Sequence, residues 1–163
     1  MAFADLSIAI VSGRRPELLA ATLASFQKNL LDNFSVKNSF MNLDPVFGDE
    51  QDHRDSIAIF RSYFPEGYVI SPAQASFGKA VQTLWKMAPD GPVLHVEDDW
   101  ELQYPVTPST VWQSMVDYGP RLRSLFLAAA TTAAPRETLR WRPNTWRSRV
   151  KYALRRIPRY TAF

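Results

Sequence analysis

Residues 6–26 read LSIAIVSGRRPELLAATLASF and decide the fold class. The first six residues form a short apolar run, which is typical of a buried strand, and Ser12 and Gly13 then indicate a loop. Pro16 suits the first turn of a helix, because its missing N–H is not needed there. Apolar residues recur at helical spacing after it, so the stretch predicts a strand, a loop and a helix over residues 16–31.

The same alternation continues along the chain. It predicts further strands over residues 34–43, 67–71, 92–97 and 125–130. It predicts further helices over residues 49–64 and 76–88, and one from residue 107 to a stop at Gly119 and Pro120. For the helix over residues 76–88, Ser76 is the expected N-cap. The residues expected on its inner face are Phe77, Val81, Leu84 and Ala88. Parallel neighbours need crossovers of this length, so the order predicts an α/β sandwich with a mostly parallel sheet.

Length and composition narrow the class of protein. A chain of 163 residues with 46% hydrophobic and 21% charged residues is expected to form one compact domain. It has no cysteine, which excludes disulfides, thiolate nucleophiles and cysteine-based zinc sites. The longest apolar stretch, residues 125–134, is too short to span a membrane, and the first residues lack the basic start of a secretory signal. We therefore expect a cytoplasmic protein.

Charge divides the chain into two parts. From Arg136 onward there are nine Lys or Arg and one Glu, whereas the preceding part has ten Lys or Arg and fifteen Asp or Glu. We expect a domain over residues 1–134 and a basic tail over residues 135–163, which could form an amphipathic helix. Such a tail suits a peripheral contact with an anionic inner membrane face, or it is simply solvated. Nucleic acid is the less favoured partner, although Trp141 and Trp146 interleave with arginines.

The candidate chemistry lies where the strands end, because an open parallel sheet binds ligands beyond the carboxyl ends of its strands. These loops hold Ser12, then Asp44, then the three consecutive carboxylates Glu97, Asp98 and Asp99. In a partly buried site, the repulsion among three carboxylates is relieved most simply by a divalent cation. Oxygen ligands suit Mg²⁺ or Mn²⁺, which usually complete their shell with phosphate and water. The alternative is an acidic loop that merely faces solvent.

Four segments in order, IAIVSGRRPELLAATLASF, MNLDP, SFGKAVQTLW and VLHVEDDWEL, together resemble the nucleotide-binding half of a glycosyltransferase of the GT-A fold, similar to family 2. The resemblance covers about residues 6–102. It implies a Rossmann-like three-layer sandwich that is truncated at its C-terminus relative to the family. It also implies transfer of a sugar from a nucleoside-diphosphate sugar to an acceptor glycan or lipid-linked saccharide, as in polysaccharide biosynthesis.

The resemblance implies a role for each site residue. Ser12 contacts the base or ribose, Asp44 reads the base, and Glu97 belongs to the carboxylate motif of the donor site. Asp98 points toward the ribose and the metal, and Asp99 binds Mn²⁺ or Mg²⁺ directly.

Two cations are candidates for binding the phosphates. Arg14 and Lys79 each lie beside the start of an expected helix, where anions are favoured. The alternative for each is a plain surface residue. Trp100, next to the motif, could stack on a sugar or base, or could pack in the core.

The chain departs from the family at the general base, which normally lies well after the carboxylate motif. Past Glu101 the sequence offers only Asp117 and Glu137, and neither is convincing. A non-catalytic or remnant domain that binds nucleotide sugars is therefore an alternative, and a module acting through the basic tail is a less favoured one. A sugar nucleotidyltransferase would share the sheet and the acidic site, but no glycine-rich basic loop stands near the N-terminus.

Overall fold

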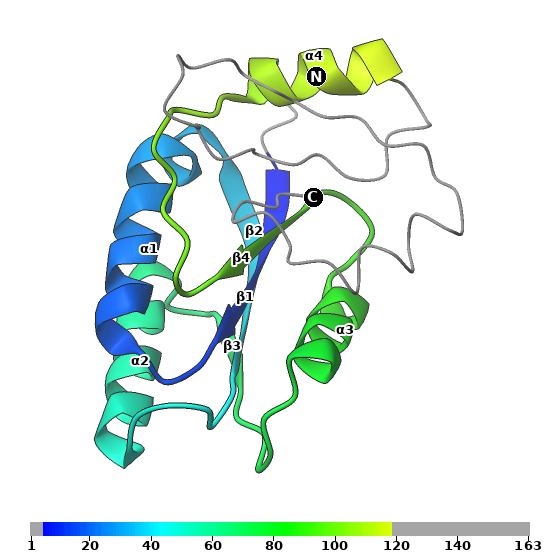
Figure 1. Cartoon of the computed structure of the whole chain (residues 1–163). Helices are drawn as coiled ribbons and strands as arrows, with labels where there is room; N and C mark the ends of the chain where they lie inside the picture. The colour runs from blue at the N-terminus through cyan, green and yellow to red at the C-terminus, as the bar shows by residue number, and fades with distance from the viewer. Residues whose placement is uncertain (1–4, 119–163) are drawn as a thin grey trace, which may run out of the picture.

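The computed structural model describes residues 5–118 and shows a parallel sheet between two layers of helices (Figure 1). The strands are β1 (Asp5–Ser12), β2 (Ser35–Leu43), β3 (Tyr68–Ile70) and β4 (Val93–Glu97). The helices are α1 (Pro16–Asn29), the 3₁₀ helix η1 (Leu31–Asn33), α2 (Glu50–Tyr63), α3 (Phe77–Met87) and α4 (Pro108–Tyr118). The predicted α/β sandwich is confirmed, and the structure is Rossmann-like.

The strand order is β3-β2-β1-β4, and all neighbouring pairs are parallel. The chain therefore builds outward from β1 in one direction with β2 and β3, and then crosses to the other side of β1 with β4. This reversal beside β1 is the point at which open α/β sheets usually bind ligands. Helices α1 and α2 cover one face of the sheet and α3 covers the other (Figure 1).

The helices begin where local chemistry predicts. Helix α1 has Pro16 in its first turn, with Glu17 near its N-terminal end and Lys28 near its C-terminal end, as the helix dipole favours. Helix α2 starts with a capping box, because the Asp49 carboxylate accepts from the backbone N–H of Asp52 at 3.1 Å while the Asp52 carboxylate accepts from that of Asp49 at 2.8 Å.

Two details of the third helix correct the sequence prediction. Ser76 precedes α3, but its hydroxyl makes no capping bond. Phe77 was expected to face inward and is instead 46% exposed, whereas Ala80 and Leu84 are buried. Leu84 and Val81 do pack against the sheet residues Ala9 and Val11, as predicted, whereas Phe77 is the first residue of the helix and lies outside this stripe.

After β4 the chain reverses and runs along α1 toward α4. The Thr22 hydroxyl donates to the Asp98 carbonyl at 2.8 Å, and the backbone N–H of Leu102 donates to the Ser25 hydroxyl at 3.1 Å. Farther on, the N–H of Val106 donates to the Asn29 carbonyl at 2.7 Å. Helix α4 thus begins beside the C-terminal end of α1, far from that helix's first turn (Figure 1).

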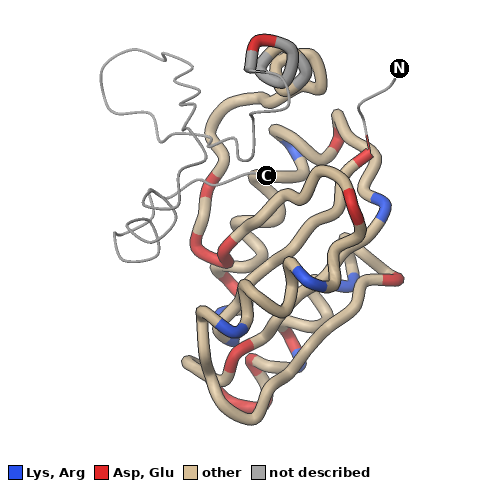
Figure 2. Tube along the Cα trace, turned by 90° about the vertical axis from the view of Figure 1, so that its right-hand side faces the viewer, with Lys and Arg blue, Asp and Glu red and all other residues tan. Residues whose placement is uncertain are grey.

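Several sequence predictions lie outside the described residues. They are the fifth strand over residues 125–130, the end of the domain at residue 134 and the amphipathic helix in the basic tail. Within residues 5–118, acidic and basic positions are interleaved along the trace (Figure 2). No helix in this part of the chain is both long and apolar enough to cross a membrane.

Candidate functional site

Asp98 ties the end of β4 to the loop between β1 and α1. Its Oδ2 accepts a hydrogen bond from the Ser12 hydroxyl at 2.8 Å and another from the backbone N–H of Gly13 at 2.7 Å. The Arg15 guanidinium adds an ion pair through Nη2 to Oδ1 and a longer contact from Nε to Oδ2 at 3.4 Å. Asp98 is 1% exposed, so its carboxylate is buried and already holds several donors. The structure therefore brings Ser12 and Asp98 together, as the sequence predicted.

Arg15 connects the buried and the exposed part of the acidic motif. Besides its pair with Asp98, its Nη2 lies 3.6 Å from Oδ2 of Asp99, whose side chain is 47% exposed. The guanidinium carbon also lies 4.8 Å from the centre of the Phe47 ring, a cation–π contact. The cation at the acidic motif is therefore Arg15, which the sequence analysis did not single out.

Arg14 points elsewhere. Its backbone adopts φ +58°, a left-handed conformation that is uncommon for residues other than glycine. Its Nη1 donates to Oε1 of Glu50 at 2.9 Å, at the start of α2. Opposite the Arg14 carbonyl stands Gly48 with φ +59°, where an added Cβ would come within 2.6 Å of that oxygen. Arg14 thus pairs with Glu50 of α2 and Arg15 with the acidic motif, and the phosphate role of Arg14 stays a prediction.

Asp44 joins the end of β2 to the segment before α3. It is 4% exposed, and its Oδ1 accepts from the Asn42 side-chain amide at 2.6 Å. Its Oδ2 accepts from the backbone N–H of Ser76 at 3.1 Å, and its own N–H donates to the Ser12 carbonyl at 2.8 Å. Asp44 therefore lies at the same edge of the sheet as Ser12, as predicted. Asn42 is a partner that the sequence analysis missed.

Glu97 lies on the α3 face of the sheet, because it is paired in register with Val11. Partial burial raises the pKa of its carboxyl to about 7, and the nearby charges of Asp99 and Asp98 act in the same direction while Arg15 opposes them. The motif thus contains three different carboxylates: Glu97 is half-buried and easily protonated, Asp98 is buried and ion-paired, and Asp99 is exposed.

His95 precedes the motif on the same strand face. Its ring meets those of Trp85 and Trp100 edge-on, with centroids 5.9 and 5.8 Å away. Burial lowers its pKa to about 4, so it is neutral at physiological pH. Its Nδ1 is buried without a hydrogen-bond partner in the structure. Trp100 itself is 4% exposed within the core cluster, so it packs in the core and does not offer a face to a ligand.

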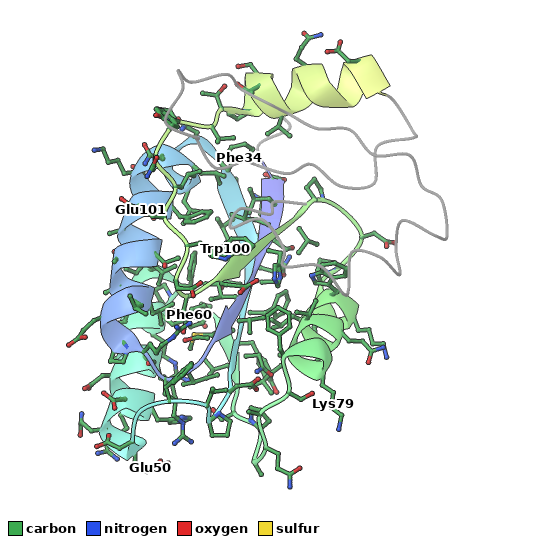
Figure 3. All side chains as sticks on the ribbon, in the orientation of Figure 1. Phe34, Glu50, Phe60, Lys79, Trp100 and Glu101 are labelled. Carbon is green, nitrogen blue, oxygen red and sulfur yellow. The ribbon has the colours of Figure 1, made fainter. Side chains whose placement is uncertain are left out.

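The remaining candidates are exposed side chains or lie outside the described residues. Lys79 is exposed on α3 and points away from the sheet (Figure 3). Asp117 is exposed on α4 and accepts from the Gln113 side-chain amide at 2.7 Å. Because α4 begins beside the C-terminal end of α1, the structure does not bring Asp117 to the acidic motif. Glu137 lies outside the described residues.

The predicted metal site can be compared with the side chains that the structure offers as metal ligands. Within residues 5–118, no group of three or more His, Asp or Glu side chains is arranged to hold a metal ion. The Asp98 oxygens are occupied by Ser12, Gly13 and Arg15, whereas Asp99 keeps an exposed carboxylate. Mg²⁺ and similar ions bind through as few as one or two carboxylates when phosphates complete the shell. The residues present therefore suit a metal that Asp99 shares with a ligand, but do not form a protein-only cage.

No family model and no curated protein matches the sequence. Among solved structures, the chain is similar to the crystal structure of a 4-diphosphocytidyl-2C-methyl-D-erythritol synthase, with 13% sequence identity and a TM-score of 0.40. The alignment covers 98% of this chain and 74% of that one. A likeness at this level identifies neither a family nor an activity, so the α/β assignment rests on the parallel sheet itself.

Proposed function

We propose that the loops after β1, β2 and β4 form the donor site of a GT-A-type glycosyltransferase that uses a nucleoside-diphosphate sugar. The observation that carries this proposal is the hydrogen bond of 2.8 Å between Ser12 and Asp98. It brings the first loop and the acidic motif together beside β1, where the strand order reverses and ligands usually bind. Asp44 extends the same edge toward the N-terminal end of α3.

In this proposal, the three carboxylates have separate tasks. Asp99 holds Mn²⁺ or Mg²⁺ together with the diphosphate, because it is the exposed member of the motif. A bound divalent cation supplies Lewis-acid stabilisation of the negative charge that develops on the departing diphosphate. Asp98 keeps Ser12 and Gly13 in place for the base or ribose, and Glu97 lies beside them on the α3 face of β4.

A non-catalytic domain that binds nucleotide sugars is the second candidate. It is favoured by the position of Asp117, which lies on α4 and away from the acidic motif, so the described residues offer no convincing base for an acceptor hydroxyl. Hydrolysis of a nucleotide sugar by the purified chain, lost in Asp99→Asn, would exclude this second candidate. A membrane contact through residues 135–163 stays a prediction, which co-sedimentation with vesicles of increasing anionic lipid content can test.

The donor site is tested by calorimetric titration with UDP, GDP, CDP and dTDP, each with Mn²⁺ or with EDTA. We expect one nucleotide to bind, more tightly with Mn²⁺, and the gain from Mn²⁺ to disappear in Asp99→Asn. Asp90→Asn is the matched control, since Asp90 is an exposed carboxylate in the turn before β4. Binding of none of the four nucleotides would contradict the proposed donor site. An unchanged gain from Mn²⁺ in Asp99→Asn would contradict the metal role of Asp99.

A further inference from the structure

The side chain of Arg15 is fixed between two carboxylates and an aromatic ring. Its Nε and Nη2 both face Asp98, so the plane of the guanidinium is set by a two-point contact with a buried group. Phe47 lies against the guanidinium at 4.8 Å. These contacts leave Nη2 3.6 Å from the Asp99 carboxylate. Arg15 is therefore a positioned cation beside the exposed member of the motif.

No other ion pair among residues 5–118 reaches the motif. The ion pairs in this part of the chain that do not involve Arg15 join Arg14 to Glu50 and Lys37 to Asp5, at other places in the fold. Arg15 consequently faces Asp99 as the one ion-pair partner that the described residues give it. The charge of Asp99 is thus partly compensated before any ligand arrives.

We propose that Arg15 is a built-in counter-cation for Asp99, which weakens the binding of a free divalent cation to the ligand-free protein. A cation at Asp99 alone would lie close to the fixed positive charge of Arg15, and two positive charges that lie close together repel each other. A diphosphate brings negative charge that offsets this repulsion and supplies the remaining oxygen ligands. The cation therefore enters together with the diphosphate. The identity of that anion rests on the proposed function, whereas the effect of Arg15 on the free cation does not.

The test is a titration of the nucleotide-free protein with Mn²⁺, in which the electron paramagnetic resonance signal reports unbound Mn²⁺. We expect Arg15→Gln to bind Mn²⁺ at least about tenfold more tightly than the unmodified protein, since a neighbouring like charge is removed. Arg14→Gln is the matched control and should leave Mn²⁺ binding unchanged, because Arg14 pairs with Glu50. The double variant Arg15→Gln with Asp99→Asn should not show the tighter Mn²⁺ binding expected for Arg15→Gln alone.

Arg15→Gln leaves Asp98 buried without its cation and could fail to fold, which a thermal melt will show. If Arg15→Gln does not fold, Arg15→Lys takes its place in the titration. It keeps a positive charge near Asp98 but lacks the planar guanidinium group that also reaches Asp99. We expect it to strengthen Mn²⁺ binding several-fold. Equal Mn²⁺ affinity in the unmodified protein and in the folded Arg15 variant would overturn the inference. The titration contains no nucleotide, so this outcome is separate from a failure of UDP, GDP, CDP and dTDP to bind.

Discussion

The face of the sheet that carries α1 and α2 is closed by a large apolar cluster, whereas the face that carries α3 has a smaller buried cluster and bears the ionisable groups His95 and Glu97. The closed face buries Leu6, Ile8, Ile10, Leu19, Leu23, Phe26, Met41, Leu43, Phe60, Leu94 and Val96. On the α3 face, the buried cluster comprises Ala9, Val11, Ala80 and Leu84. The same face of β4 carries His95 and Glu97.

This difference separates the larger apolar core from the titratable groups of β4. Burial of large side chains contributes most of the favourable free energy of folding, and close packing makes that face intolerant of change. The α3 face carries the titratable groups His95 and Glu97 on the strand that leads into the acidic motif. Substitutions on the two faces should therefore differ in how much they lower the free energy of unfolding. They should also differ in whether that change depends on pH.

The largest effect is expected at the centre of the closed face. Phe60 is fully buried and lies 5.3 Å from the Phe64 ring, and an added Cβ at Gly67 would come within 2.4 Å of it. Phe60→Ala should lower the free energy of unfolding by about 3–5 kcal/mol, because it removes a buried ring and leaves a cavity. Urea denaturation measures this. Phe77→Ala on α3 is the control and should cost less than about 0.5 kcal/mol, since Phe77 is 46% exposed.

A second comparison lies within the acidic motif. Asp98→Asn should lower the free energy of unfolding by about 3 kcal/mol, because it removes the buried charge that pairs with Arg15 and accepts from Ser12 and Gly13. Asp99→Asn should change it by less than about 0.5 kcal/mol, since that side chain is exposed. Both are measured by denaturation without metal. Equal costs for the two substitutions would show that the motif is not divided into a structural and a ligand-facing carboxylate.

The α3 face should make stability depend on pH through His95. Its pKa is about 4 in the folded protein against 6.5 for an ordinary histidine, so the unfolded chain binds the proton more readily. Stability from this residue is present above pH 6.5 and is lost as pH falls toward 4, by about 2 kcal/mol between pH 6.5 and about pH 4.5. His95→Phe keeps a ring between Trp85 and Trp100 and should remove this loss. The measurement is the free energy of unfolding against pH, and an unchanged slope in the variant would refute the assignment.

Much of this arrangement follows from sequence patterns. The period of the apolar residues places β1, α1, α2 and β4 within a few residues of their observed bounds, because each pattern reflects which face a segment buries. The rule for parallel sheets also predicts that Ser12, Asp44 and Asp98 lie at one edge. These predictions succeed because they depend on local periodicity and on the direction of the strands.

The sequence does not predict which donors occupy a carboxylate. Arg14 and Arg15 are adjacent and chemically alike, and the left-handed backbone at Arg14 decides which one faces Asp98. Gly48, which is remote in the sequence, lies against the Arg14 carbonyl, where an added Cβ would come within 2.6 Å of that oxygen. Likewise, Thr22 meets the Asp98 carbonyl only because the chain after β4 reverses along α1. Such contacts join residues more than 30 positions apart, and no local pattern records them.

The smallest effect should come from Glu97, with the sign opposite to that of His95. Its pKa is raised from 4.5 to about 7, so the folded protein holds the proton more tightly than the unfolded chain. Stability from Glu97 is present below pH 4.5 and is lost as pH rises toward 7. Because the side chain is only half-buried, solvent reduces the effect to about 1 kcal/mol.

Glu97→Gln, followed in EDTA, should remove this loss, so the variant should gain stability relative to the unmodified protein as pH rises from 4.5 to 7. In His95→Phe the Glu97 contribution should no longer be offset by that of His95, so stability should rise less with pH than in the unmodified protein. If stability instead rises with pH as steeply as in the unmodified protein, groups other than these two control the titration of the α3 face.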